Sequence, residues 1–251
     1  MASSLAALEN RWVVDAMITS LNHILEVRYS AKYEEQGPIG VSEHIKAPGE
    51  PAQIEFIALD DDPAKVVKAV RKYKTKDCNC VLTVFHEMLA TRDIKTHYAR
   101  QNLEFLHTRP VLGVELPAPD LRGEAVVRVI KSREQADSAN RQLSIENESI
   151  PTETLMDMHI HNLVAEKNDH VAGWAQLVTA FSGVGFIQQL FTLTGFRNQR
   201  VGSTLLTFVH EEAERLGMIR MALVPSDTAF RVFRRFGYSP LAYFTVFQPN
   251  N

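Results

Sequence analysis

The segment from Leu193 to Ser203, Leu-Thr-Gly-Phe-Arg-Asn-Gln-Arg-Val-Gly-Ser, contains residue types that could bind a pyrophosphate. It joins a predicted strand to a predicted helix, and a helix N-terminus presents unpaired N–H groups and the positive end of the helix dipole. Gly202 and Ser203 are small enough to let an anion approach, and Arg197 and Arg200 add positive charge. Taken alone, this pattern also fits an ordinary polar loop between a strand and a helix.

A second motif, one predicted strand further along the chain, makes the first more specific. The first motif contains Arg197-Asn-Gln-Arg-Val-Gly202, and the second is Ser226-Asp-Thr-Ala-Phe-Arg-Val-Phe-Arg-Arg-Phe-Gly-Tyr238. Their order and placement resemble the Arg/Gln-x-x-Gly-x-Gly/Ala and Asn-x-x-Ala-x-x-Leu-Tyr-x-x-x-Gly-Phe motifs of the GNAT superfamily of acyl-CoA-dependent N-acyltransferases. The resemblance covers residues 124–251. It implies an α/β (α+β) fold with a mixed, mostly antiparallel sheet flanked by helices.

The resemblance also implies that acetyl-CoA is the co-substrate and lies against the loop and its neighbours. The implied cofactor contacts are Phe191, Thr192, Leu193, Arg197, Asn198, Gln199, Arg200, Val201, Gly202, Ser203, Ser226 and Phe233. A primary amine would attack the thioester directly. A backbone N–H near Phe191 or Leu193 would donate to the oxyanion of the tetrahedral intermediate.

The sequence departs from the family pattern at positions that matter for chemistry. Arg200 replaces the first glycine of the loop, so its backbone either avoids a positive φ or accepts a small strain. Phe233 stands where many members have a tyrosine that protonates the leaving thiolate. Gln188 or Gln189 stands where a strand glutamate often acts as a base through water.

Other groups could carry the proton instead. The candidates are His159, Gln188, Ser226 and Tyr238, with His161 as an alternative on the same strand as His159. A lysine-like amine loses its proton roughly 3.4 pH units above neutrality. Burial can lower an amine pKa by about 3–5 units, so a desolvating site could work without a carboxylate.

Two residue pairs allow a metal-site interpretation that the sequence does not favour. His159 and His161 share one face of a strand, with His170 predicted close across a hairpin, but no Cys, Asp or Glu completes a ligand set. A half-buried strand face is the simpler interpretation of these histidines. Cys78 and Cys80 have the same spacing and favour a small core pair, since two cysteines are too few for a disulfide scaffold. We therefore predict no metal.

Apolar periodicity and turn signals predict the elements that must position these groups. Helices are expected at 4–27, 63–73, 87–106, 132–145, after Pro151, from Ser203 to Leu216, and at 227–236, with a capping box formed by Ser132 and Gln135. Strands are expected at 54–59, 78–85, 111–116, 125–130, 159–166, 170–180, 184–193, 219–224 and 242–247. The Gly- and Pro-rich stretch 34–53 is predicted to be a loop that could gate a site. A tight turn at Asn168-Asp169 would place His161 opposite Gln176.

The stretch from Pro117 to Gly123 is the best candidate linker, because two prolines and a glycine interrupt two strand-like segments there. It predicts an N-terminal α/β domain at 1–119 and an acetyltransferase domain at 120–251. Both halves share a strand-helix-strand-helix-strand order, so the N-terminal half resembles a degenerate GNAT repeat. Its first strand is followed by Asp60-Asp-Asp-Pro63, whose charges would repel a pyrophosphate.

The composition is that of an ordinary globular protein. The 251 residues include 27 Lys plus Arg and 30 Asp plus Glu, giving a net charge of -3. This balance argues against a general nucleic-acid binder. The N-terminal stretch carries charges at Glu9, Arg11 and Asp15, and no apolar run approaches the ~18–20 residues of a membrane span. We therefore expect no nucleic-acid or membrane partner and a cytoplasmic location.

The sequence thus predicts an acetyl-CoA-dependent N-acetyltransferase that acts on a primary amine of a small molecule, as a monomer or homodimer. The alternative is a catalytically silent acyl-CoA-binding or partner-binding module built on the same fold. The missing tyrosine and glutamate motivate that alternative.

Overall fold

The computed structural model describes residues 8–47, 49–73, 78–226 and 228–249, apart from the side chains of Cys78 and Leu89. Two compact units are present. Unit 1 contains the residues up to Ile18, Leu25–Val111 and the residues from Pro240 on, and unit 2 contains Thr19–Ile24 and Leu112–Ser239. The division of the sequence into an N-terminal domain at 1–119 and an acetyltransferase domain at 120–251 stays a prediction.

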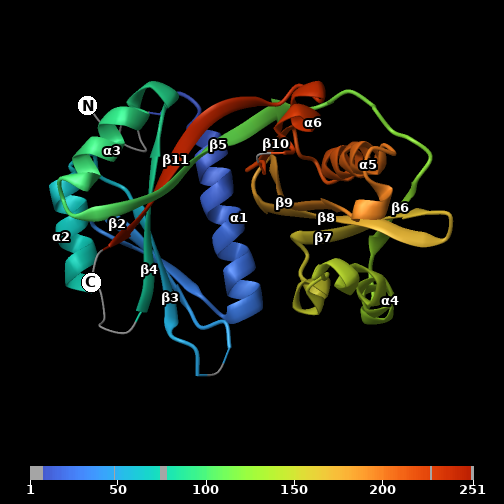
Figure 1. The fold of residues 1–251 in the computed structure, drawn as a ribbon, viewed down its shortest axis with the longest axis horizontal. Coiled ribbons are helices and arrows are strands. Elements are labelled where there is room, and N and C mark those ends of the chain that lie inside the picture. The colour runs from blue at the N-terminus through green and yellow to red at the C-terminus, as the bar shows by residue number, and fades with distance from the viewer. Residues whose placement is uncertain (1–7, 48, 74–77, 227, 250–251) are drawn as a thin grey trace. The chain divides into compact units, whose positions relative to one another are not determined.

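Unit 1 is a sheet with the strand order β1-β2-β3-β4-β11-β5. The strands are β1 (Lys32–Gln36), β2 (Ile39–His44), β3 (Ala52–Ala58), β4 (Cys78–His86), β11 (Ser239–Pro249) and β5 (Leu103–Glu115), and the last runs on into unit 2. The helices are α1 (Arg11–Tyr29), α2 (Pro63–Tyr73) and α3 (Thr91–Ala99), with a 3-10 turn η2 (Met88–Ala90). Apolar residues of α2 and α3 pack on one face of this sheet (Figure 1).

The predicted loop and gate at 34–53 is wrong. Residues 32–44 form the β1–β2 hairpin, which turns at Gly37 with φ 64°, and β3 begins at Ala52. The polar residues of β1 hide the strand from a sequence pattern, because an exposed edge strand can keep charged side chains on both faces. The segment is part of the sheet and is not a gate.

Two helix predictions in unit 1 are wrong at their ends. The helix expected at 87–106 stops at Ala99, because Asn102 takes a left-handed φ of 59° and Leu103 begins β5. The first helix starts at Arg11, and the part of the prediction that falls on residues 4–7 lies outside the described residues. Cys80 is buried in the core of unit 1, whereas the side chain of Cys78 is outside the described part, so the core pair stays a prediction.

Unit 2 is a sheet with the strand order β5-β10-β9-β8-β7-β6, in which only the β9–β10 pair is parallel among the described pairs. The remaining strands are β6 (Val126–Ile130), β7 (Ile160–Lys167), β8 (His170–Phe181), β9 (Val184–Thr192) and β10 (Arg220–Leu223). The helices are α4 (Arg133–Leu143), α5 (Val201–Arg215) and α6 (Phe230–Arg235), with 3-10 turns η3 (Ser144–Glu146), η4 (Thr152–Met156) and η5 (Thr194–Phe196). The predicted fold class, a mixed and mostly antiparallel sheet flanked by helices, is confirmed.

Helices α4 and α5 cover opposite faces of the β6–β9 strands (Figure 1). The predicted capping box begins α4, where Ser132 Oγ accepts a hydrogen bond from the Gln135 N–H at 3.3 Å. The helix expected at 227–236 is described as helical only from Phe230, and residue 227 lies outside the described residues. None of the described helices is long and apolar enough to cross a membrane.

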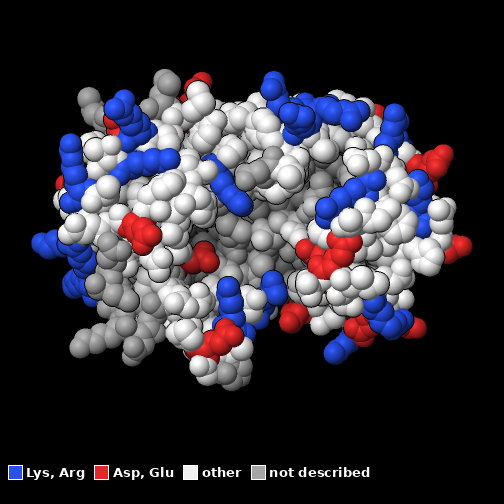
Figure 2. Space-filling model, viewed as in Figure 1, with Lys and Arg blue, Asp and Glu red and all other residues white. Residues whose placement is uncertain are grey.

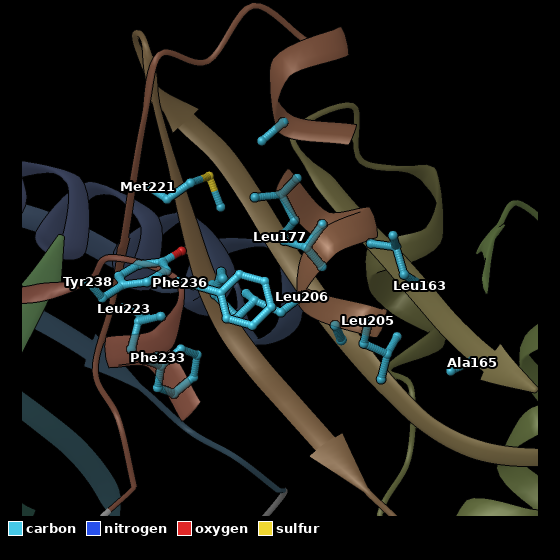
Figure 3. Close-up of a cluster of buried hydrophobic side chains, with 14 of the residues drawn as sticks. Leu163, Ala165, Leu177, Leu205, Leu206, Met221, Leu223, Phe233, Phe236 and Tyr238 are labelled. Carbon is cyan, nitrogen blue, oxygen red and sulfur yellow. The ribbon is translucent and has the colours of Figure 1, made fainter. Parts of the chain in front are cut away.

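The larger core of unit 2 lies between α5, α6 and the sheet. Figure 3 shows Leu205 and Leu206 of α5 in one cluster with Phe233, Phe236 and Tyr238. The aromatic side chains of Phe233 and Phe236 are therefore core. The arginines on the opposite side of α6 are exposed, in agreement with the basic side chains that gather over this helix in Figure 2, and they are Arg231, Arg234 and Arg235.

The register of the β7–β8 hairpin differs from the prediction by one residue. Asn162, and not His161, lies opposite Gln176. Asn168 and Asp169 form the expected tight turn with φ 52° and 60°, but the register shifts beyond it between Ala165 and Glu166. A bulge of one residue moves every later pair to the other face of the strand, and no turn signal reveals it.

Buried His210 makes the stability of the core depend on pH. Burial lowers the pKa of His210 to about 4, so below its ordinary value of 6.5 the folded state binds fewer protons than the unfolded state. This contribution to stability is present above pH 6.5 and is lost as the pH falls towards 4. Between pH 7 and 5, the unfolding free energy of the wild type should fall by about 2 kcal/mol more than that of His210→Gln. Denaturant unfolding at both pH values measures this difference.

The control is His170→Gln, which changes an exposed histidine at the start of β8. It should keep the pH dependence of the wild type. Equal slopes for the wild type and His210→Gln would contradict a neutral buried imidazole at this position.

Candidate functional site

Strands β9 and β10 separate part-way along their length. They pair in parallel from Val184 with Arg220 to Ile187 with Leu223, where β10 ends. β9 continues to Thr192 alongside β8. The edge of β9 beyond Ile187 that faces away from β8 is therefore open to a ligand.

A bulge lies at the point where the two strands part. Gln189 pairs with Gln176 and Ile187 pairs with Leu177, so Gln188 is an extra residue in β9. Gln188 is exposed. Bulges redirect backbone groups and are common beside active sites.

The backbone donors at this opening are not those that the sequence suggested. The Leu193 N–H donates to the Ala172 carbonyl at 2.9 Å, and the alternation of an antiparallel ladder directs the Phe191 N–H to β8 as well. The same alternation turns the N–H groups of Leu190 and Thr192 towards the opening. The N–H groups of Phe191 and Leu193, which the sequence suggested as oxyanion donors, are thus directed at β8 and away from the opening.

The predicted phosphate loop connects the end of β9 to α5. The first helical hydrogen bond runs from the Thr204 N–H to the Arg200 carbonyl at 2.9 Å, so the N–H groups of Val201, Gly202 and Ser203 precede the helical ladder. A Cβ added to Gly202 would lie 3.2 Å from Thr192 Oγ1. Glycine thus lets the first turn of α5 approach β9 closely.

Arg200 adopts the left-handed conformation, with φ 62° and ψ 10°. Of the two alternatives that the sequence left open, the backbone accepts the strain. Gly123 packs against this residue, since a Cβ there would lie 2.9 Å from Arg200 Cβ, and its N–H donates to Thr204 Oγ1 at 2.7 Å. The predicted linker therefore fixes the loop against the start of α5.

Glu146, which the sequence analysis missed, binds the first part of the loop, at Thr194 and Arg197. Its carboxylate accepts from the Thr194 N–H at 2.6 Å and from the Thr194 hydroxyl at 2.8 Å, and Arg197 Nη2 lies 3.7 Å away. These hydrogen bonds from Thr194 lower the pKa of Glu146. Arg197 also donates from Nε to the Thr192 carbonyl at 3.2 Å, while Gln199 donates to the Gly195 carbonyl at 3.0 Å.

Glu148 is a second carboxylate that the sequence analysis missed. It accepts from Trp174 Nε1 at 3.1 Å and from Gln189 Nε2 at 3.0 Å. Trp174 is a core residue, but its indole N–H points at this carboxylate. Glu148 thus lies beside Gln189, one of the two positions, Gln188 and Gln189, where the family pattern has a glutamate. The spacing of Glu146 and Glu148 in a loop carries no signal of this placement.

Other predicted site residues lie elsewhere. Tyr238 is 2% exposed, hydrogen bonds to His210 at 2.9 Å, and has a pKa raised well above its ordinary value by burial. It therefore cannot serve as an accessible proton donor, and that prediction is wrong. Phe233 is buried beside it. Ser226 is exposed after the end of β10, with its Oγ 3.4 Å from Thr228 Oγ1.

The histidines of β7 are not brought to the strand opening. The His159 carbonyl accepts from the Thr179 N–H at 2.8 Å, just beyond the Ile160–Val178 pair that ends the β7–β8 ladder. Its ring meets that of His23 at a centroid distance of 5.5 Å, and the Asp157 carboxylate accepts from the His159 N–H at 2.8 Å.

Burial raises the pKa of Asp157, but the hydrogen bonds from His23 and from the His159 N–H outweigh it, and the pKa is lowered overall. His161 faces α5, where its Nδ1 lies 3.8 Å from Glu212, and burial lowers its pKa. His170 pairs with Lys167 at the far end of the hairpin, so the expected proximity of the three histidines is wrong. Among the described residues, no group of three or more His, Cys, Asp or Glu side chains could hold a metal ion.

Comparison with known proteins agrees with this geometry. Residues 129–238 match the Acetyltransferase (GNAT) family. This region is a GNAT domain. An aminoalkylphosphonate N-acetyltransferase from Salmonella typhimurium is 33% identical over 92 residues, which are 34% of this chain and 60% of that protein. The chain therefore spans about 60% of the length of this curated relative.

Solved structures extend the likeness beyond the GNAT domain. A GCN5-related N-acetyltransferase from Kribbella flavida has a TM-score of 0.70 at 20% identity, covering 94% of this chain and 95% of that chain. A tandem GNAT protein from the clavulanic acid biosynthesis pathway has a TM-score of 0.59 at 11% identity, covering 100% and 98%. At these identities the likeness shows the fold. It includes the N-terminal half, in agreement with the predicted tandem arrangement.

The left-handed residue of the GNAT loop gives a stability prediction. A Cβ in this conformation costs about 1 kcal/mol, which glycine avoids. We expect Arg200→Gly to be more stable than Arg200→Ala by about 1 kcal/mol, because both variants lose the guanidinium and only alanine keeps the Cβ. Thermal or denaturant unfolding of the pair measures the difference. An alanine variant as stable as the glycine variant would rule out the left-handed backbone at residue 200.

Proposed function

We propose that this protein is an acetyl-CoA-dependent N-acetyltransferase that acetylates a primary amine of a small molecule by direct attack on the thioester. The observation that carries the proposal is the parting of β9 from β10 at the Gln188 bulge, with the N-terminus of α5 at the end of the opened strand. An extended acyl donor needs an open strand edge and an anion site in line with it. The GNAT domain supplies both.

The residues present fit the diphosphate of acetyl-CoA. The N–H groups of Val201, Gly202 and Ser203 form a cradle that a Cβ at Gly202 would crowd against Thr192. Exposed Arg200 adds positive charge beside these groups, whereas Arg197 is already paired with Glu146. When bound, acetyl-CoA would supply an activated thioester carbonyl.

In the proposed reaction, the chain orients the thioester and polarises its carbonyl group. The N–H of Leu190 or Thr192, both turned towards the opening, would donate to the carbonyl oxygen as negative charge develops on it. Removing one donor of this kind typically costs about 100- to 1,000-fold in rate. Because the donors are backbone groups of a paired strand, they need no reorganisation during the reaction.

The acceptor is proposed as a small amine. The name of the Salmonella typhimurium relative specifies an aminoalkylphosphonate, a small molecule that combines an amine with an anion. We carry over only the amine, because this chain spans about 60% of that protein. The panel of amines that tests the activity would also identify the rest of the acceptor molecule.

The N-terminal half is proposed to have lost cofactor binding. At the junction from β3 to α2, Asp62 Oδ1 accepts from the Ala64 N–H at 2.9 Å, and Asp60 Oδ1 accepts from the Asp62 N–H at 2.8 Å. Carboxylates thus take the backbone donors that a phosphate would need. This supports a single acetyl-CoA site per chain, in the C-terminal GNAT domain.

A second candidate function is acyl-CoA binding without transfer. Phe233 in place of a tyrosine and the burial of Tyr238 favour it, since neither residue can protonate a leaving thiolate. Thiol release in the presence of an amine panel separates the two functions. Binding without release across the panel would support the binding module.

Calorimetric titration of acetyl-CoA and desulfo-CoA tests the cofactor site. We expect Gly202→Asp to weaken both affinities at least about tenfold, or about 1.4 kcal/mol, because it places a carboxylate in the cradle. Gly202→Ala should give a smaller loss, since it adds the Cβ alone. The control Ser182→Asp adds the same charge at the exposed β8–β9 turn and should bind as the wild type does. Absence of binding to the wild type would contradict the proposal.

A further inference from the structure

The carboxylate of Glu148 is held by neutral donors alone. Trp174 Nε1 and Gln189 Nε2 both donate to the same oxygen, Oε2, at 3.1 and 3.0 Å. Across the described ranges, Oε1 of Glu148 accepts no hydrogen bond, and no Lys, Arg or His lies within ion-pair distance of this carboxylate. A half-buried carboxylate normally has a cationic partner or several donors. Oε1 is thus available to accept a hydrogen bond from a cation with N–H groups.

Glu148 belongs to a row of polar side chains that crosses the sheet on the α4 face. Gln176 donates to Asn162 Oδ1 at 2.9 Å, and Asn162 donates to Thr154 Oγ1 at 3.1 Å. Gln176 is also the cross-strand partner of Gln189, which donates to Glu148. These buried side chains hydrogen bond to one another, and the row ends at Glu148, whose Oε1 is not used by the row. The shifted register of β7 creates this row, since it brings Asn162 opposite Gln176.

The row ends at the place where the strands part. Gln189 directly follows the bulged Gln188, two residues beyond the last β9–β10 pair at Ile187. Thr192 faces α5, since its Oγ1 is the atom nearest to a Cβ at Gly202. Gln189 lies three residues from Thr192 and so has its side chain on the opposite face. Glu148 and the phosphate loop therefore approach the same opening from opposite faces of β9.

We propose that Glu148 binds the ammonium group of the acceptor and takes up its proton, directly or through one water. The inference rests on the proposed acetyl transfer. One N–H bond of the ammonium breaks, its electron pair stays on nitrogen, and the proton passes to Glu148. That pair then forms the C–N bond to the acetyl carbonyl carbon, and the C–S electron pair leaves with the CoA sulfur. The new amide nitrogen releases its second N–H proton to solvent, and the thiolate takes up one proton from solvent. Glu148 thereby supplies the carboxylate that β9 itself lacks.

Glu146 does not compete for this role, although it lies two residues away. Both of its oxygens are engaged by Thr194, and Arg197 neutralises its charge. Glu146 thus holds the loop before α5 that would bind acetyl-CoA, whereas Glu148 is left for the acceptor amine. The two variants Glu146→Gln and Glu148→Gln should therefore affect different substrates.

The test compares Glu148→Gln with the wild type by steady-state thiol release over a pH series. Glutamine keeps an oxygen for Trp174 and Gln189 but removes the charge and the basic site. For alkylamine acceptors at pH 7 we expect kcat/KM to fall at least about 100-fold, as for loss of a general base. With a nucleophile that is already unprotonated at pH 7, such as an aryl hydrazine, the loss should be less than about tenfold. The variant should regain rate as the pH rises towards the pKa of the alkylamine.

Three controls separate this role from a structural one. The affinity of Glu148→Gln for acetyl-CoA by calorimetry should match the wild type, whereas Glu146→Gln should weaken it. Glu148→Asp should recover part of the alkylamine rate. Glu153→Gln removes an exposed carboxylate on η4 and should leave all rates unchanged.

Equal losses of Glu148→Gln for alkylamines and aryl hydrazines, or an unchanged pH profile, would overturn the assignment of Glu148 while leaving the acetyltransferase standing. A wild type that binds acetyl-CoA but releases no thiol with any acceptor would overturn both proposals. The two failures are thus distinguishable.

Discussion

The separation of β9 from β10 is the constraint on which the rest of unit 2 depends. A buried strand that leaves its neighbour exposes a row of backbone N–H and C=O groups that must find other partners. Here the separation follows four parallel pairs, and the Gln188 bulge marks its start. The other side of β9 pairs with β8, and the core between α5 and the sheet packs against it. A site built from such an edge is pre-organised for an extended ligand.

The two faces of the open strand carry different chemistry. On the α5 face, Gly202 and the N–H groups of the first helical turn favour an anion, and Arg200 accepts a left-handed backbone to make that turn. On the α4 face, Glu148 lies at the end of a polar row and favours a cation. One face of the strand thus favours an anionic ligand and the other face favours a cationic ligand. The backbone N–H groups at the open edge lie between the two.

The missing tyrosine and glutamate have different structural explanations. Phe233 and Tyr238 are both part of the hydrophobic core, where Tyr238 hydrogen bonds to His210, so no phenol from these positions reaches the opening. The glutamate is absent from β9, but a carboxylate is present beside Gln189 all the same, supplied by the segment between η3 and η4. A side chain can be replaced by one from another segment when both reach the same point in space. A comparison of single positions along one strand misses such a replacement.

The sequence by itself determined the strand-to-helix loop, the second motif, most elements of unit 2 and hence the GNAT resemblance, because these follow from local spacing and turn chemistry. It also left two alternatives for the backbone of Arg200, which either avoids a positive φ or accepts a small strain. Only the tertiary structure decided that residues 32–44 are strands, that Asn162 and not His161 faces Gln176, and that Glu148 meets Gln189. Each of these depends on pairing between segments distant in sequence or on a bulge of one residue. Strand pairing is a long-range property, and a shift of one residue exchanges the two faces of a strand, so no local pattern could have specified them.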